Sequence, residues 1–271
     1  MSTNQGTGNE NIAVLIISCD KYCDLWKPFF TLFFRYWTDC PFQLYLVTNH
    51  LCYNDRRVTC ITVGDDHDWS SSLRKALKII PSRFLIILLE DYLLNAAVDT
   101  HRILEYVKYM GSKHATCLQL FRFSPIIGPV RPSDDHPDIG YLDRGTPYRV
   151  SLQAAIWDKQ DIDRLLQDGE SAWQFEMEGT VRSALLDTPF LSLISWKKCP
   201  IPYFTTAVIG GKWQREAVKF CKRENVTVDL SVRGQRTLLE SMYTRILIRS
   251  LISYRWTVHR VAFLKRWIYR I

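Results

Sequence analysis

Apolar residues in the first 120 positions are grouped in short uninterrupted runs, with amphipathic stretches between them. Five such runs are present, at residues 12–18, 42–49, 58–64, 84–89 and 115–120. Runs without polar alternation are typical of strands that are buried on both faces of a sheet. Three intervening stretches keep apolar side chains on one helical face, at residues 25–36, 69–80 and 100–110. This alternation predicts parallel strands in a layered α/β sheet flanked by helices.

The second half of the chain is less regular. Residues 124–148 are rich in Pro, Gly and Asp, which predicts a long loop over the sheet edge, and loops of that length are usually functional. Further predicted elements follow: a strand at 150–157, helices at 159–168 and 173–186, and a strand-and-turn unit at 203–213. We therefore expect one domain over residues 12–240, preceded by a polar, disordered N-terminus at 1–11.

The positive charge of the chain is concentrated at its C-terminal end. The formal net charge is +7, and residues 241–271 contain seven arginines and lysines and no acidic residue. Ile, Leu, Phe and Trp alternate with these cations, which predicts a basic amphipathic helical segment at an anionic membrane surface. Two other interpretations are an ordinary helix packed on the domain and a nucleic-acid contact. We expect this segment to contact a membrane surface, and we expect no nucleic-acid partner.

Composition also indicates the cellular compartment. No apolar run reaches the roughly 20 residues of a membrane-crossing helix, and the N-terminus lacks the basic region of a signal peptide. The eight cysteines show neither a Cys-x-x-Cys pair nor a zinc-ligand spacing, which predicts reduced thiols. We expect a cytoplasmic protein, peripheral on the inner face of the plasma membrane.

Two adjacent carboxylates, Glu90 and Asp91, follow the apolar run at 84–89. Open α/β sheets hold their ligands at the carboxyl ends of their strands. Two oxygen ligands there can bind a divalent cation that carries a phosphorylated substrate. The other interpretation is that one carboxylate caps the next turn and the other pairs with a surface cation.

With these pieces in order, the chain resembles nucleotide-sugar glycosyltransferases of the GT-A type, most closely bacterial enzymes of surface-polysaccharide and lipopolysaccharide synthesis. The resemblance covers roughly residues 12–215 and rests on four stretches, at residues 18–21, 69–80, 89–92 and 173–176. It implies a GT-A-like (Rossmann-like) single domain. It also implies transfer of a sugar from a nucleotide-sugar donor, expected to be a UDP-sugar, to a glycan or lipid-linked acceptor.

The resemblance also implies a metal cofactor. In the family an Asp-x-Asp motif binds Mn²⁺ or Mg²⁺, which bridges the two donor phosphates. Here Glu90 and Asp91 stand without a spacer, and Asp91 best matches the final metal-binding Asp of the family. We expect Asp91, with Glu90, to bind the cation and Asp91 to be catalytic, and the missing spacer leaves metal dependence open.

Donor contacts are expected directly after the first strand and at the start of the helix at 69–80. The resemblance places Ser18 and Asp20 at the base and ribose, with Lys21 near a phosphate. Ser72 and Arg74 begin a helix that lines the nucleotide pocket in similar enzymes, and the forked donors of Arg74 can bind a diphosphate. Alternatively, Asp20 is a helix cap, Lys21 is solvated, and Ser72 and Arg74 are cap and surface residues.

Two further residues complete the predicted site. Glu176 is the expected general base of an inverting transfer, with Glu178 as its competitor. The alternative is that both acids stabilise a helix N-terminus. Lys212, in a Gly-Gly-Lys turn, can neutralise the leaving phosphate, although such turns are common.

Two rival functions belong to other classes. The first is a catalytically inactive GT-A-like domain that binds a glycan or organises a membrane assembly. The second is a nucleotidyltransferase, against which the sequence after the first strand lacks a Gly-rich, basic phosphate loop.

Overall fold

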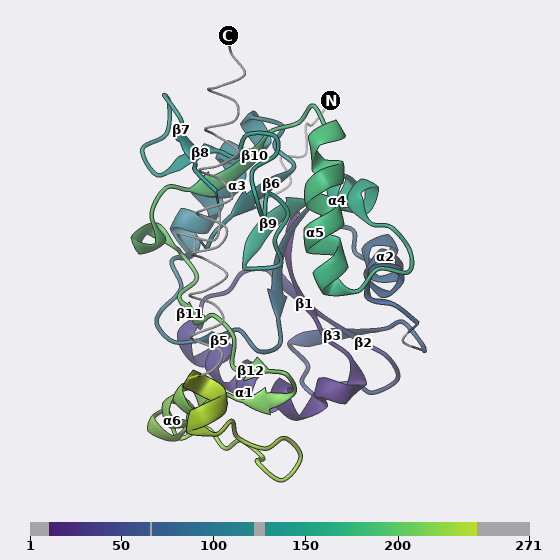
Figure 1. Ribbon diagram of the computed structural model, residues 1–271, viewed down its shortest axis with the longest axis vertical. Coiled ribbons are helices and arrows are strands. Elements are labelled where there is room, and N and C mark those ends of the chain that lie inside the picture. The colour runs from purple at the N-terminus through teal and green to yellow at the C-terminus, as the bar shows by residue number, and fades with distance from the viewer. Residues whose placement is uncertain (1–10, 66, 122–127, 243–271) are drawn as a thin grey trace, which may run out of the picture.

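The computed structural model describes residues 11–65, 67–121 and 128–242. Its centre is a nine-stranded sheet with helices on both faces (Figure 1). The strand order is β3 (Val58–Thr62), β2 (Gln43–Thr48), β1 (Ile12–Ile17), β4 (Phe84–Leu89), β9 (Ala155–Asp158), β6 (Cys117–Gln119), β10 (Phe190–Leu193), β8 (Ile139–Tyr141) and β7 (Arg131–Pro132).

Most strands of this sheet point the same way. β3, β2, β1 and β4 are parallel neighbours, and β6 is parallel to β10. β9 runs antiparallel between β4 and β6, and β8 runs antiparallel to β10 and β7. All strands except β9 and β8 therefore share one direction. The predicted α/β class, with a mostly parallel sheet flanked by helices, is confirmed.

The core has two layers, one on each face of the sheet. Alternate residues of β1 enter different clusters: Ile12, Val14 and Ile16 face one layer, whereas the residues between them face the other. The first layer contains α1 (Cys23–Tyr36), α3 (Thr100–Ser112) and α6 (Arg215–Arg223). The second contains α2 (Trp69–Ile79), α4 (Lys159–Leu165) and α5 (Ala172–Arg182). Burial on both faces explains why β1 and β4 read as continuous apolar runs.

Short elements complete the fold. β5 (Leu93–Leu94) pairs with β11 (Tyr203–Phe204), and β12 (Val208–Ile209) pairs with β13 (Lys212–Trp213). Gly210 and Gly211 join the last two strands with φ of 58° and 76°, a left-handed conformation that glycine adopts without steric cost. Three 3-10 turns are η1 (Asp20–Tyr22), η2 (Ser183–Leu185) and η3 (Trp196–Lys198).

Several elements differ from the sequence prediction. The strand predicted at 150–157 is regular only from Ala155, because the Leu152 N–H is bonded to a side chain rather than to a strand neighbour. β7 and β8 lie within the predicted loop at 124–148, and β10 and α6 were not predicted. α6 was missed because, of its nine residues, only Ala217, Phe220 and Cys221 are buried.

The prediction that all cysteines are reduced is wrong for one pair. Cys52 and Cys60 form a disulfide across eight residues, and the other six cysteines are free thiols. The pairing of β2 with β3 brings the loop that carries Cys52 against Cys60, and no sequence spacing marks this proximity.

The predicted N-terminus at 1–11 and basic segment at 241–271 lie outside the described residues, except for Asn11, Ser241 and Met242. Within the described ranges, no helix has the length and apolar character needed to cross a membrane.

Candidate functional site

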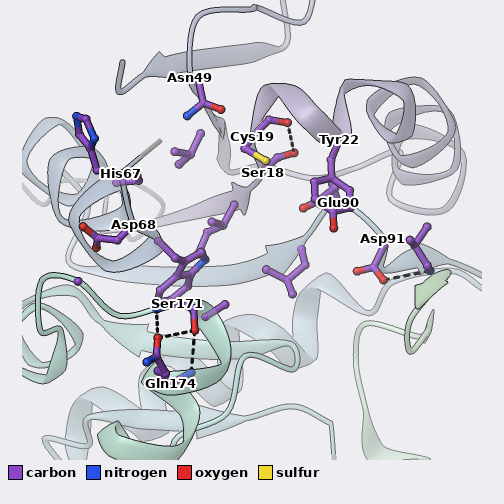
Figure 2. A pocket seen from close by; sticks show the side chains of 18 residues that line it. Ser18, Cys19, Tyr22, Asn49, His67, Asp68, Glu90, Asp91, Ser171 and Gln174 are labelled. Carbon is purple, nitrogen blue, oxygen red and sulfur yellow. Dashed lines mark hydrogen bonds between the residues drawn. The ribbon is translucent and has the colours of Figure 1, made fainter. Parts of the chain in front are cut away.

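A cavity of about 530 Å³ opens at the carboxyl ends of β1, β2 and β4 (Figure 2). Its remaining walls are the start of α2, the start of α5 and Val208. The volume lies within the ~300–1,000 Å³ range of small-molecule sites. The lining residues are Ile17, Ser18, Cys19, Tyr22, Val47, Asn49, His67, Asp68, Trp69, Ser72, Leu89, Glu90, Asp91, Gly169, Ser171, Ala172, Gln174 and Val208.

Glu90 and Asp91 lie together on one side of this cavity (Figure 2). Asp91 Oδ2 accepts hydrogen bonds from Thr206 Oγ1 at 2.6 Å and from the Val208 N–H at 3.4 Å. Burial raises the pKa of Asp91, and these hydrogen bonds counteract part of the shift. Burial, followed by the charge of Asp91, raises the pKa of Glu90 to about 8. The pair is therefore a half-buried acidic centre with a high affinity for positive charge.

The charged groups of the cavity wall are unbalanced. Asp68, Glu90, Asp91 and His67 are the titratable acid and imidazole groups there, and no described lining residue is Lys or Arg. The cation that acts on Glu90 from behind the wall is Arg233. It is engaged already, in a buried ion pair with Asp24 at 2.8 Å.

This arrangement fits a divalent cation that arrives with a phosphorylated ligand. The described residues contain no cluster of three or more His, Cys, Asp or Glu side chains that could enclose a metal. Mg²⁺-type sites commonly use one or two carboxylates and complete their coordination with substrate phosphates and water. Glu90 and Asp91 are the residues that would hold such an ion.

The opposite side of the cavity carries groups suited to hydrogen bonding (Figure 2). Asn49 Nδ2 donates to the Gly64 carbonyl at 3.1 Å, which fixes the amide at the end of β2. Asp68 caps α2 by accepting the Ser71 N–H at 2.7 Å. Ser171 and Gln174 form a capping box at the start of α5. The Glu90–Asp91 pair on one side of the cavity therefore faces amide, hydroxyl and carboxylate groups on the other side.

The predicted donor contacts near β1 have separate locations. Ser18 lines the cavity, and its Oγ accepts the Trp26 indole N–H at 2.8 Å. Asp20 lies outside the lining, where its carboxylate accepts the backbone N–H groups of residues 49–51. Lys21 is exposed and also outside the lining, and its carbonyl accepts a bond from Arg233.

The other predicted residues divide in the same way. Ser72 lines the cavity, whereas Arg74, two residues further along α2, pairs with Asp168 at 3.0 Å. Lys212 pairs with Glu240 at 2.7 Å on the surface. The structure thus brings Ser18, Ser72, Glu90 and Asp91 together and places the remaining predicted residues elsewhere.

Glu176, the predicted base, is not part of the cavity lining. Its Oε1 accepts the Leu152 N–H at 2.7 Å and the Ser151 hydroxyl at 3.1 Å. Burial raises the pKa of Glu176, whereas Glu178 is exposed. The carboxylate of Glu176 therefore holds the segment that leads into β9.

Sequence reasoning missed six polar residues of the wall. Three signals were available: Asn49 directly follows a buried strand, Asp68 directly precedes the predicted helix at 69–80 as an N-cap residue does, and Ser171-x-x-Gln174 has the spacing of a capping box. The other two missed residues, Tyr22 and His67, carry no such local signal.

Comparisons with known proteins give only distant likenesses. Neither a protein-family model nor a curated protein matches the sequence. The structure is similar to TarS 1–349 from S. aureus, with 10% identity and a TM-score of 0.45 over 71% of this chain and 59% of that chain. The corresponding values for its complex with UDP-GlcNAc are 11%, 0.45, 75% and 60%. For the bifunctional IspDF from Campylobacter jejuni they are 14%, 0.37, 64% and 47%.

This chain thus spans about 60% of the length of these two TarS chains. Similarity at this level carries no function with it. The function is therefore argued from the cavity.

Proposed function

We propose that this protein is a glycosyltransferase of GT-A-like fold that binds a nucleotide-sugar donor, expected to be a UDP-sugar, in the cavity. The sugar would pass to a glycan or lipid-linked acceptor in bacterial surface-polysaccharide or lipopolysaccharide synthesis. The observation that carries the proposal is the Glu90–Asp91 pair, which faces a cavity whose described lining contains neither Lys nor Arg.

The charge of the wall determines what can bind. A diphosphate beside this half-buried acid pair would meet no Lys or Arg in the described lining to offset its charge, and it would be repelled by each of the two acids that is ionised. Lys21, Arg74 and Lys212 lie outside the lining and do not supply that charge there. We therefore infer that Mn²⁺ or Mg²⁺, held by Glu90 and Asp91, accompanies the donor. Such an ion stabilises the negative charge that develops on the departing diphosphate.

The polarity of the cavity sets the orientation of the donor. If the diphosphate lies at the acid pair, the nucleoside extends toward Asn49, His67 and the start of α5 (Figure 2). Amide, imidazole and hydroxyl groups can donate to and accept from a base and a ribose. Ser18 and Ser72 are the proposed direct contacts between these two ends. Asp20 and Arg74 would act through the loops that they hold, and a phosphate contact by Lys21 or Lys212 stays a prediction.

Glu176 is the proposed general base of an inverting transfer. The acceptor oxygen would attack the anomeric carbon, its proton would pass to the carboxylate, and the nucleoside diphosphate would leave with the bonding electron pair. Because Glu176 is not part of the cavity lining, this role requires the acceptor to bind beside the cavity, next to α5. Burial raises the pKa of Glu176, and a base with a higher pKa accepts a proton more readily.

Membrane association is proposed from the sequence. The seven cations and interleaved apolar residues of 241–271 favour a peripheral location at the cytoplasmic face of the plasma membrane. This location would bring the cavity to a lipid-linked acceptor. Sedimentation of the full chain with vesicles that contain phosphatidylglycerol tests it, and no binding above that to phosphatidylcholine vesicles would contradict it.

Calorimetric titration with UDP, GDP, CMP and ADP, with and without Mn²⁺, tests the donor site. We expect one nucleotide to bind in a metal-dependent manner and Asp91→Asn to abolish this binding. Asp39→Asn is the control, because Asp39 is exposed and outside the cavity. Binding without metal would keep the donor site but remove the metal role, and no binding would favour an inactive domain. Release of a nucleoside diphosphate rather than pyrophosphate separates sugar transfer from nucleotidyl transfer.

A further inference from the structure

The connection between α4 and α5 forms one wall of the cavity. Gly169 and Ser171 belong to the lining, and Gln174 follows within the first turn of α5. Residues 167–169 are exposed, and Gly169 has a φ of 89°, so this wall is a sharp surface turn rather than part of the core. Its position therefore depends on polar contacts more than on apolar packing.

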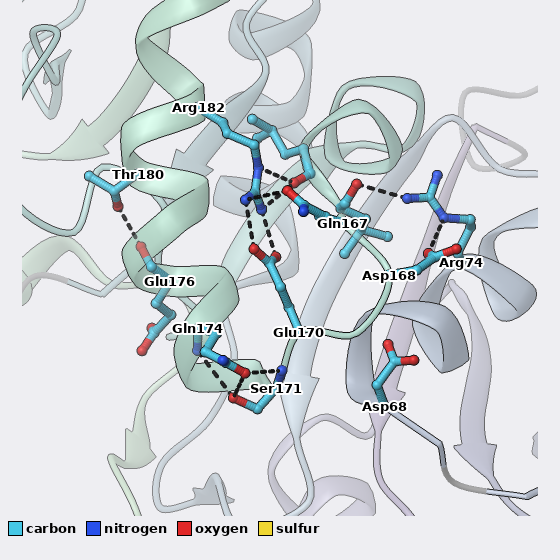
Figure 3. Close-up of polar contacts among 12 residues, drawn as sticks. Asp68, Arg74, Gln167, Asp168, Glu170, Ser171, Gln174, Glu176, Thr180 and Arg182 are labelled. Carbon is cyan, nitrogen blue, oxygen red and sulfur yellow. Dashed lines mark hydrogen bonds and ion pairs between the residues drawn. The ribbon is translucent and has the colours of Figure 1, made fainter.

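Arg182 holds this connection from α5 (Figure 3). Its two terminal nitrogens donate to the two carboxylate oxygens of Glu170, each at 2.6 Å. Its Nε and Nη2 also donate to the Leu165 carbonyl, at 3.0 and 2.8 Å. The Glu170 side chain is only 11% exposed. A bidentate pair of this kind fixes orientation as well as distance.

Arg74 holds the same connection from α2 (Figure 3). It donates to the Leu166 carbonyl at 2.7 Å and to Asp168 at 3.0 Å. The Ser70 N–H adds a bond to the Glu170 carbonyl at 3.1 Å. Two arginines on two helices thus fasten both ends of a short turn that would otherwise have few fixed contacts.

We infer that Arg182 and Glu170 are positioning residues for the nucleoside part of the donor, an inference that rests on the proposed function. Ser171 directly follows Glu170 and caps α5, and its Oγ lies 2.8 Å from Gln174 Oε1. Fixing Glu170 therefore fixes the two polar side chains that this wall presents to the cavity. The acid pair directly follows β4 and does not depend on the Arg182–Glu170 contact.

This separation gives the inference a specific test. We would measure the affinity of Arg182→Met for Mn²⁺ alone and for the nucleotide that binds the unaltered protein best among UDP, GDP, CMP and ADP. We expect about tenfold weaker nucleotide binding and unchanged Mn²⁺ binding. Arg182→Lys keeps the charge but loses the fork, so its loss is expected to be intermediate.

Matched variants separate positioning from general damage. Arg164→Met removes an ion pair between the exposed Arg164 and the buried Asp161 on α4, outside the cavity lining, and should leave both affinities unchanged. Glu170→Ala combined with Arg182→Met should be no weaker than Arg182→Met alone, because both changes remove one contact. If Arg182→Met fails to fold, Glu170→Gln, which keeps the shape of the pair, replaces it with an expected loss of about threefold.

Each outcome has a defined consequence. Unchanged nucleotide affinity in Arg182→Met and Glu170→Gln would overturn the inference and leave the proposed function intact. An equal loss of nucleotide and Mn²⁺ affinity would also overturn it, because the pair would then be a general structural element. If the unaltered protein binds none of the four nucleotides, the proposed function and this inference both fail.

Discussion

Thr206 Oγ1 donates a 2.6 Å hydrogen bond to Asp91 Oδ2, from a position 115 residues further along the chain. The Ala207 N–H donates to the Asp91 carbonyl at 3.0 Å, so both the side chain and the backbone of Asp91 are fixed by one segment. The bond from Thr206 orients a half-buried carboxylate and favours its ionised form. We infer that the segment before β12 determines how Asp91 meets a cation.

Thr206→Val tests this relationship. The substitution removes the hydroxyl donor with little change in shape, so Asp91 loses orientation and its pKa rises further. We expect Mn²⁺ affinity to fall about tenfold, as for loss of an outer-shell partner of a metal ligand. Titration of Mn²⁺ followed by electron paramagnetic resonance measures the effect, with Thr205→Val as the control. Equal affinities in the two variants would contradict the role of Thr206.

The pKa of Glu90 predicts a specific dependence of stability on pH. The folded-state pKa of about 8 lies above the ordinary value of 4.5, so the folded chain binds more protons between these values. The stabilisation is fully present below pH 4.5 and is lost as pH rises through about 8. Without metal, Glu90→Gln should flatten this decline and be the more stable protein above pH 8. Urea denaturation from pH 5 to 9 measures it, and parallel curves for the two proteins would exclude the prediction.

Metal binding should show the opposite dependence on pH. A cation that binds Glu90 displaces its proton, so Mn²⁺ affinity should rise about tenfold per pH unit between pH 6 and 8. Calorimetry in buffers of different ionisation enthalpy measures the proton release directly. Mn²⁺ affinity that does not vary over this range would show that Glu90 is not a ligand.

Asp20 is expected to contribute mainly through the loop that follows β2. Its carboxylate accepts three backbone N–H groups, which lie on Asn49, His50 and Leu51. Asp20→Ala should lower the free energy of unfolding by about 2 kcal/mol, the typical contribution of charged hydrogen bonds. Nucleotide affinity should fall as well, because Asn49 lines the cavity. Asp39→Ala on the surface is the control, and a loss of similar size there would remove the special role of Asp20.

The base assignment for Glu176 can be separated from its structural role. Glu176→Gln retains an oxygen that can accept the bonds from Leu152 and Ser151, so the fold and nucleotide binding should change little. Loss of the base should lower sugar transfer by at least about a hundredfold. Single-turnover transfer and calorimetry measure the two properties. Transfer at the normal rate in Glu176→Gln would assign the residue to structure alone.

The disulfide predicts a measurable dependence on redox conditions. Cys52 and Cys60 close a loop with a sequence separation of 8, for which chain-entropy arguments give about 2.5 kcal/mol of stabilisation. Reduction should therefore lower the unfolding free energy by that amount and raise the number of titratable thiols from six to eight. Thiol titration under denaturing conditions provides the count. Eight thiols before reduction would contradict the pairing.

Local patterns in the sequence were sufficient for the strands and helices of the first 120 residues, apart from the two-residue strand β5. β1 and β4 are continuous apolar runs because both faces of the sheet are covered. A run of this kind predicts a buried strand from the local sequence alone, whichever strands lie beside it. The same runs located Glu90 and Asp91, since a residue that directly follows a buried strand must lie at the sheet edge. β10, by contrast, is only four residues long, and a run of that length is too short for its apolar pattern to identify a strand.

Tertiary structure alone decided which polar residues reach the cavity. Arg74 lies two residues beyond the lining residue Ser72 and so on the other side of α2, where it meets Asp168 because the α4–α5 connection passes over α2 there. Glu176 is likewise directed to Leu152 by the packing of α5. Each of these contacts joins residues 24 or more positions apart, so no local pattern encodes it. Sequence determines which residues are buried through the periodicity of apolar positions, whereas the direction of a charged side chain depends on which distant backbone the fold brings beside it.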